Sequence, residues 1–269
     1  MSAYAEAYEI RSRRVPGILF TAFVLFSAGC ATPKQKATDT ALREAHIDPA
    51  TAGVVSGRVL FSGPEPKRVK LDLSANPTCE REHLKPVYSE QVVVNKNGTL
   101  RNTLVWIKSG LPSVRWTAPA ATVAFDQVGC VYQPHALSLM TGQTLEISNS
   151  DPLNHNVHAQ SAANMAFNVA QPPRAEKLYQ RFDREELMIP VTCGVHPWMT
   201  AYISVISHPF FAVTGDDGSF ELKGLPAGRY VLEAVHERYG HREMAFTIAA
   251  NERKMLDLTY AQTPAGGIL

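Results

Sequence analysis

The chain has 269 residues, with 26 Lys and Arg against 25 Asp and Glu and a formal net charge of +1. Apolar residues make up 45% and charged residues 19%, which excludes a disordered chain and a polytopic membrane protein. The balanced charge excludes a protein that binds nucleic acid through a strong basic patch. Four cysteines without a Cys-x-x-Cys pair are too few for a disulfide scaffold.

Residues 1–30 are predicted to be a signal peptide with a lipobox. Three arginines within residues 11–14 precede an apolar run over residues 15–28, which is shorter than the roughly 20 residues of a transmembrane helix. Ser27-Ala28-Gly29-Cys30 resembles a bacterial lipobox, although that pattern usually has Leu where Ser27 stands. The resemblance implies lipidation of Cys30 and, because alanine follows it, an outer-membrane lipoprotein. Ordinary signal cleavage or an uncleaved anchor are the alternatives.

Residues 31–52 are predicted to form a flexible tether. They are rich in Thr, Lys, Ala and Asp and contain no aromatic residue, a composition typical of a spacer between a membrane and a folded domain. Residues 1–29 carry three Arg and two Glu, so the chain without them has 23 basic and 23 acidic side chains. A neutral mature protein favours docking through an apolar patch over long-range electrostatic steering.

The rest of the chain is predicted to be all-β. Short segments rich in β-branched and aromatic residues alternate with turn sequences such as Asn97-Gly98 and Thr141-Gly142, and no window has the period of a long helix. Such spacing favours sandwiches or barrels. The predicted strands are Val54–Phe61, Gln91–Val94, Thr103–Ile107, Thr144–Ser148, Leu187–Thr192, Ala201–Ser207, Ser219–Leu222, Arg229–Ala234 and Glu243–Ile248.

Residues 119–207 carry a set of soft and imidazole ligands. His155 follows Asn149 and Asp151, and the later loop reads Cys193-Gly-Val-His196-Pro-Trp-Met199. This order resembles the cupredoxin family, the amicyanin- and plastocyanin-like type 1 copper domains with a Greek-key β-sandwich. The resemblance implies one type 1 copper ion bound by His155, Cys193, His196 and Met199.

The chemistry of these four residues agrees with the resemblance. Two imidazoles and a thiolate with a weak axial thioether are the ligands of blue-copper electron-transfer sites. A structural zinc accepts His and Cys as well, but a thioether is a poor zinc ligand. A two-copper centre would need a second cysteine in the loop, and Cys193 stands there alone.

Several neighbours of the predicted ligands have two interpretations. The resemblance implies that Asn149 ties the two ligand loops together around the ligands; the alternative is an ordinary turn residue. His158 is expected to point away from His155, and His135 to be a satisfied polar residue on an early strand. Pro197 and Trp198 are expected at a partner-facing surface, with simple packing as the alternative.

The C-terminal region has a second resemblance. Phe211 to Leu232, with its Asp216-Asp217-Gly218 and Leu225-Pro226-Ala227-Gly228 turns, resembles the carboxypeptidase-regulatory-like, or prealbumin-like, β-sandwich. Gly57-Arg58-Val59 and Val105-Trp106-Ile107 are similar to the opening strands of that family. We therefore expect a discontinuous sandwich of residues 53–118 and 208–260 around a cupredoxin domain of residues 119–207, followed by a tail of residues 261–269. Two contiguous domains are the alternative.

The two remaining cysteines, Cys79 and Cys130, are expected to pair, because oxidation is the default in an exported protein. The alternative is a free Cys130, or a second metal site that includes Cys130 and His135.

The predicted function is single-electron transfer on the periplasmic side of the bacterial envelope. The partner would be a redox protein such as a c-type cytochrome or a periplasmic oxidoreductase, and the chain would reach the membrane through its lipid anchor. We expect no enzyme, because the sequence has no paired carboxylates and no nucleophile–base set. The alternative is a copper-binding or structural envelope lipoprotein without an electron-transfer role.

Overall fold

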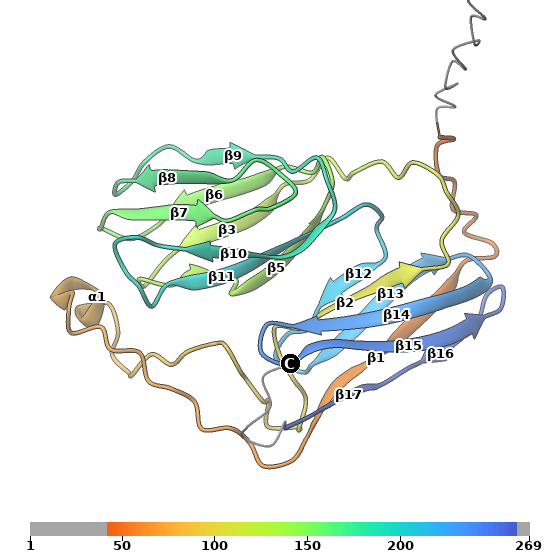
Figure 1. The fold of residues 1–269 in the computed structure, drawn as a ribbon, viewed down its shortest axis with the longest axis horizontal. Helices are drawn as coiled ribbons and strands as arrows, with labels where there is room; N and C mark the ends of the chain where they lie inside the picture. Colours follow the sequence, from red (N-terminus) through yellow and green to blue (C-terminus); the bar gives the residue numbers. More distant parts are fainter. Residues whose placement is uncertain (1–41, 263–269) are drawn as a thin grey trace, which may run out of the picture. The chain divides into compact units, whose positions relative to one another are not determined.

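A computed structural model describes residues 42–262 and confirms the all-β class. The described residues form seventeen strands and one short helix, α1 (Pro77–Arg81). The strands make four sheets that pair into two sandwiches, shown in Figure 1. We call the one built from residues 123–206 the inserted sandwich and the other the host sandwich.

The inserted sandwich consists of one five-stranded and one four-stranded sheet. The five-stranded sheet has the order β5-β11-β10-β7-β8, and the four-stranded sheet the order β4-β3-β6-β9. β5 runs parallel to β11 and β3 parallel to β6, while the other neighbours are antiparallel. The strands are β3 (Val123–Gln127), β4 (Tyr132–Gln133), β5 (Ala136–Met140), β6 (Leu145–Asn149), β7 (His155–Ala159), β8 (Phe167–Gln171), β9 (Leu178–Gln180), β10 (Glu186–Thr192) and β11 (Thr200–Ile206).

The host sandwich combines strands from both sides of the inserted one. β1 pairs with β13, β16 and β17, and β2 pairs with β12 and β14, which pairs in turn with β15. Inward-facing apolar residues alternate along β1 and β13, so each sheet buries one face. The strands are β1 (Gly53–Ser62), β2 (Leu104–Ser109), β12 (Phe211–Val213), β13 (Ser219–Leu225), β14 (Gly228–His236), β15 (Gly240–Ile248), β16 (Arg253–Met255) and β17 (Leu258–Ala261).

Each sandwich has its own apolar core, and a third cluster joins them. Leu104, Trp106 and Val235 of the host sandwich pack with Ile206 of β11. The Nε2 atom of His135, next to β5, also meets the carboxylate of Glu237 in the β14–β15 turn. Both contacts involve buried groups, so the two sandwiches are in contact through buried side chains.

One predicted strand is wrong. Residues 91–94 form bends and a single bridge between Val94 and Leu100, because a tight turn at Asn95–Gly98 folds the chain back before a ladder can extend. The other predicted strands match observed ones to within three residues; the largest differences are at β15, which starts three residues earlier than predicted, and at β13, which ends three residues later.

Part of the link between β1 and β2 packs on the inserted sandwich, while its end, with Leu100, Val92 and Val94, returns to the host core. Its residues Leu73 and Cys79 belong to the core of the inserted sandwich, and Leu71 and Val87 pack against that core. The sequence assigned this stretch to the regulatory-like sandwich, residues 53–118. Residues 71–87 of this stretch instead bury apolar side chains against the core of the inserted sandwich.

Part of the predicted tether is also ordered. Ala45 donates its backbone N–H to Arg115 at 2.8 Å, and Ile47 packs against the host core. The tether prediction therefore extends too far toward residue 52. The predicted signal peptide with Cys30 lies outside the described residues, as do residues 31–41 of the predicted tether and 263–269 of the predicted tail.

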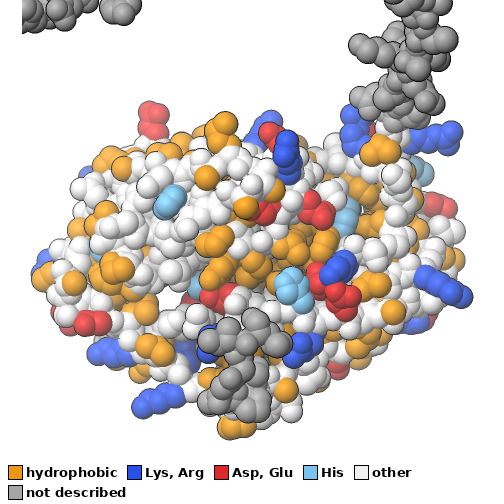
Figure 2. Space-filling view, in the orientation of Figure 1, with side chains coloured by type: hydrophobic (Ala, Val, Ile, Leu, Met, Phe, Trp, Pro, Cys, Tyr) orange, Lys and Arg blue, Asp and Glu red, His pale blue; other side chains and the backbone are white. Residues whose placement is uncertain are grey.

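Within residues 42–262 no helix has the length and apolar character needed to cross a bilayer. On the face drawn in Figure 2, the described acidic and basic side chains are scattered among apolar ones.

Candidate metal centre

The predicted ligands come from two places at one end of the inserted sandwich. His155 opens β7, and residues 193–199 form the loop between β10 and β11. Two backbone hydrogen bonds tighten this loop, from Cys193 N to Met199 O at 3.3 Å and from Met199 N to His196 O at 2.9 Å. A short Cys-x-x-His-x-x-Met loop between paired strands therefore holds three of the four predicted ligands together.

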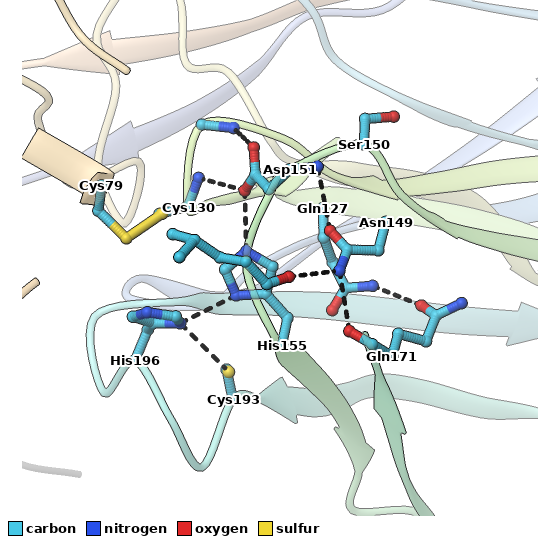
Figure 3. Close-up of polar contacts among 12 residues, drawn as sticks. Cys79, Gln127, Cys130, Asn149, Ser150, Asp151, His155, Gln171, Cys193 and His196 are labelled. Carbon is cyan, nitrogen blue, oxygen red and sulfur yellow. Dashed lines mark hydrogen bonds and ion pairs between the residues drawn. A yellow bond between two sulfur atoms is a disulfide. The ribbon is translucent and has the colours of Figure 1, made fainter. Parts of the chain in front are cut away.

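Three ligand atoms converge in a buried position, as Figure 3 shows for the labelled side chains. The Nδ1 atoms of His155 and His196 are 2.9 Å apart, and Cys193 Sγ lies 3.9 Å from His196 Nδ1. His155, Cys193 and His196 are at most 4% exposed. Met199, on the same loop, is 1% exposed and belongs to the same core.

The outer nitrogen of each imidazole has its own partner. His155 Nε2 lies 2.8 Å from the carboxylate of Asp151, and His196 Nε2 lies 2.9 Å from the side-chain amide of Asn76. These contacts fix both rings so that their Nδ1 atoms face the shared position. Hydrogen bonds of this kind orient histidine ligands and set their tautomer in metal sites.

Asp151 occupies the centre of a small anion-binding turn. Its two carboxylate oxygens accept the backbone N–H groups of Gly129 and Cys130 at 2.5 and 2.7 Å. Both residues have positive φ angles, 67° and 54°, and such successive N–H groups form a concave anion site. Burial alone would raise the pKa of Asp151, but His155 and these N–H groups hold it below its usual value.

The charges around the cluster favour a thiolate. Burial raises the pKa of Cys193, but the hydrogen bond from His155 and contacts with backbone N–H groups outweigh it and lower the pKa below the ordinary thiol value. Burial lowers the pKa of His155, while Asp151 and Cys193 together raise it to about 9. Burial and the neighbouring charge of His155 lower the pKa of His196. A thiol of lowered pKa beside two imidazoles favours the uptake of a soft cation.

The prediction that Asn149 ties the two ligand loops together is wrong, because its hydrogen bonds go to other residues. Among the hydrogen bonds of the described residues, those of its side chain reach Asp151, Leu153, Gln171 and Pro172, and none reaches residues 193–199. Asn149 therefore closes the turn before β7 and ties it to the end of β8.

Asn156 links the two ligand segments instead. Its Oδ1 accepts the backbone N–H of Gly194 at 2.6 Å and lies 3.4 Å from Cys193 Sγ. Sequence reasoning missed it, because alternation along a strand places the side chain after His155 on the opposite face, and the fold brings the Cys193 loop to that side chain.

The other two cysteines are joined. Cys79 in α1 and Cys130 form a disulfide beside the two histidines. This pairing removes a free Cys130 and a second site with His135 from the open alternatives. The His135 ring instead contacts Thr200 O and Glu237. His158 is half-buried further along β7, opposite Asn168 and Thr192.

The residues expected at a partner-facing surface differ in their exposure. Pro197 and Val195 are exposed, but the half-buried Trp198 donates its Nε1–H to Cys130 O at 2.9 Å. His196 itself is buried beneath Asn76. Of the residues expected at a docking surface, Pro197 is therefore accessible, while Trp198 packs on the 129–130 turn and His196 is covered.

The donor set fits copper. Of the metal-capable clusters within the described residues, the two that include Cys130 contain a disulfide sulfur, which leaves His155, Cys193 and His196. Two imidazoles whose Nδ1 atoms face one shared position, beside a cysteine of lowered pKa and a buried thioether on the same loop, match the ligands of a blue-copper site.

No protein-family model and no curated protein matches the chain. Among solved structures, it is similar to a novel purple cupredoxin from Nitrosopumilus maritimus, with 20% identity over 30% of this chain and 97% of the other and a TM-score of 0.26. A reduced variant of amicyanin has 21% identity over 33% and 85%, with a TM-score of 0.28. A copper-containing nitrite reductase from Thermus scotoductus has 21% identity over 32% of this chain and 22% of the enzyme, with a TM-score of 0.30. Because these scores are low, the function rests on the donor set.

Proposed function

We propose that this protein is a type 1 copper protein that carries single electrons between redox partners on the periplasmic side of the bacterial envelope. The observation that carries the proposal is the convergence of His155 Nδ1, His196 Nδ1 and Cys193 Sγ within 4.8 Å in a buried position. Bound copper would supply a one-electron carrier that alternates between Cu(II) and Cu(I).

The chain's own residues would hold that ion with little rearrangement. His155, Cys193 and His196 would bind it, and Met199 would be the weak fourth ligand. Asp151 and Asn76 fix the rings, and Asn156 holds the Cys193 loop by accepting the Gly194 N–H. Because every ligand is buried and held from outside, both oxidation states would meet the same donors.

The wider setting is part of the same proposal. A lipid on Cys30 would anchor the chain in the outer membrane, and the host sandwich would be a carboxypeptidase-regulatory-like module without chemistry of its own. The protein would be a carrier and not an enzyme, with a c-type cytochrome or a periplasmic oxidoreductase as partner.

The test begins with metal-free full-length protein titrated with Cu(II). We expect one equivalent to give intense visible absorption from thiolate-to-copper charge transfer, reversibly bleached by ascorbate and restored by an oxidant. Cys193→Ser should abolish the colour. The matched control is His158→Gln on the same strand, which should keep it.

A colourless copper complex, or colour that survives Cys193→Ser, would overturn the copper assignment. Colour without reversible reduction, or without electron exchange with a c-type cytochrome in stopped-flow mixing, would leave the alternative of a copper-binding envelope lipoprotein. Preference for zinc, with no stable copper complex, would support a structural metal instead.

A further inference from the structure

One loop from outside the inserted sandwich covers the candidate metal centre. Residues 70–88, which we call the cap, leave and return at the same point: Lys70 bridges Tyr88, and Leu71 donates its N–H to Val87 O at 2.9 Å. A loop whose ends meet in this way is a compact unit that packs by its own side chains. It contains α1 and contributes Leu73 and Cys79 to the core of the inserted sandwich.

The cap is fastened to the 129–130 turn at two points. The Cys79–Cys130 disulfide is the first, and the second joins His83 Nε2 to Gly129 O at 2.6 Å. A side chain at residue 129 would collide with the His83 ring, since an added Cβ would lie 2.8 Å from it. The 129–130 turn and the cap therefore pack tightly against each other at Gly129 and His83.

Within the ligand loop, the residue that the cap contacts is buried, whereas its neighbours are exposed. Gly194, Val195 and Pro197 are exposed, yet His196 between them is 1% exposed. The Asn76 amide contacts its Nε2 atom. The same Asn76 side chain caps α1, accepting the Thr78 N–H at 3.2 Å through Oδ1. Asn76 thus connects the start of α1 directly to a predicted ligand.

We propose that the cap is a built-in cover of the metal centre, locked by the Cys79–Cys130 disulfide, in which Asn76 positions His196 and closes it to solvent. This inference rests on the proposed function only for the identity of the metal. An imidazole that binds a metal through Nδ1 carries its proton on Nε2. In this structure the Asn76 amide nitrogen donates to Nε2, and when Nε2 carries the proton the amide must turn to present its oxygen as the acceptor.

The cap also acts on the second histidine through the turn it fastens. Gly129 and Cys130 donate their backbone N–H groups to Asp151, whose carboxylate meets His155 Nε2. Trp198, two residues after His196, donates to Cys130 O. The disulfide therefore joins the cap to a turn that contacts both ligand segments, which a packing contact elsewhere on the surface would not do.

The experiment labels histidines in the metal-free, full-length protein with diethyl pyrocarbonate, which acylates an accessible neutral imidazole nitrogen. Mass spectrometry of peptides gives the rate for each histidine. His46 is exposed and serves as the fast reference, while His208 is buried in the host sandwich and reports global unfolding. In the native protein we expect His196 to react as slowly as His208.

Two variants open the cap in different ways. Asn76→Ser keeps an oxygen that can cap α1 but cannot reach His196, so His196 labelling should rise about fivefold, the factor for one lost hydrogen bond. The paired change Cys79→Ala with Cys130→Ala removes the lock, and labelling should rise more than about tenfold. Leu84→Ala, on the exposed outside of the cap, is the matched control and should change nothing.

His208 must stay slow in each variant, so that faster His196 labelling reports local opening. Fast labelling of His196 in the native protein, or rates unchanged by both variants, would overturn the cover. If His208 accelerates in the disulfide variant, Asn76→Ser decides, because it retains the disulfide. Since no copper is present, the outcome is independent of the test of electron transfer.

Discussion

Asp151 holds His155 from the side opposite the candidate metal position, with 2.8 Å between a carboxylate oxygen and the ring Nε2. Three N–H groups converge on this one carboxylate. Its position requires two acceptor oxygens, which only a carboxylate supplies.

Asp151→Asn should therefore weaken copper binding by about 10- to 100-fold, the usual cost of losing the partner of a histidine ligand. The amide would turn an NH₂ group toward N–H donors and leave at least one of them without an acceptor. Competition with a chelator of known affinity measures the change. Asp126→Asn is the matched control, because Asp126 also accepts three hydrogen bonds at the same end of the sandwich but contacts no histidine. Equal losses in both variants would contradict the assigned role.

Alanine variants of Asn156 and Asn149 should differ in their effect on the absorption spectrum, although both should lower stability. Asn156→Ala removes the acceptor of the Gly194 N–H and the contact with Cys193 Sγ, so it should shift the charge-transfer band and cost about 1–3 kcal/mol of unfolding free energy. Asn149→Ala breaks hydrogen bonds away from the thiolate and should lower stability while the band stays in place. Absorption spectra and urea unfolding of both variants test this, and a shifted band in Asn149→Ala would restore the role first implied for it.

His236 should make the host sandwich sensitive to acid. It is buried against Tyr239 and Tyr260, and burial, with a smaller contribution from His135, lowers its pKa from 6.5 to about 4. Between these values the unfolded chain binds a proton on His236 that the folded chain does not, so stability falls as the pH drops from 6.5 to 4. His236→Phe should flatten that fall in urea unfolding, whereas substitution of the exposed His46 should leave it as steep as in the native protein.

Gly57 of β1 lies against Leu256, in the short segment between β16 and β17. A Cβ at this position would come within 1.8 Å of the Leu256 carbonyl oxygen, and both groups belong to paired backbone. Gly57→Ala should therefore cost more than about 2 kcal/mol of unfolding free energy, since the strands must separate. Gly215→Ala has open space around the new methyl group and should stay within about 0.5 kcal/mol. Thermal unfolding of the two variants gives the comparison, and similar melting temperatures would contradict it.

The sequence alone was enough for the parts of the site that lie close together along the chain. Cys193, His196 and Met199 share one loop, whose resemblance to the cupredoxin family implies copper and whose residue types agree with it. β1, β13 and β14 have clear alternation and turn residues, and they were predicted closely. β9, β12 and β16, of three residues each, have too little pattern to be seen before their neighbours are known.

What escaped prediction depends on contacts between distant residues. Asn76 stands 120 positions before His196, in a polar stretch with no periodicity, and nothing in its surroundings marks it as a neighbour of a ligand. The family resemblance points to Asn149 and says nothing of Asn156, and only the path of the turn before β7 shows which side chain reaches the Cys193 loop.

The cap comes from outside residues 119–207, which matters for any attempt to isolate the candidate metal centre by itself. A fragment cut at residues 119 and 207 would contain all four predicted ligands, yet it would lack Asn76, His83 and Cys79. Its Cys130 would become a free thiol beside both histidines, and the His196 edge would be open to water and to other metals. A fragment that keeps these contacts must include residues 70–88, which lie between β1 and β2. A shorter fragment with the ligand motif alone would have a differently covered centre.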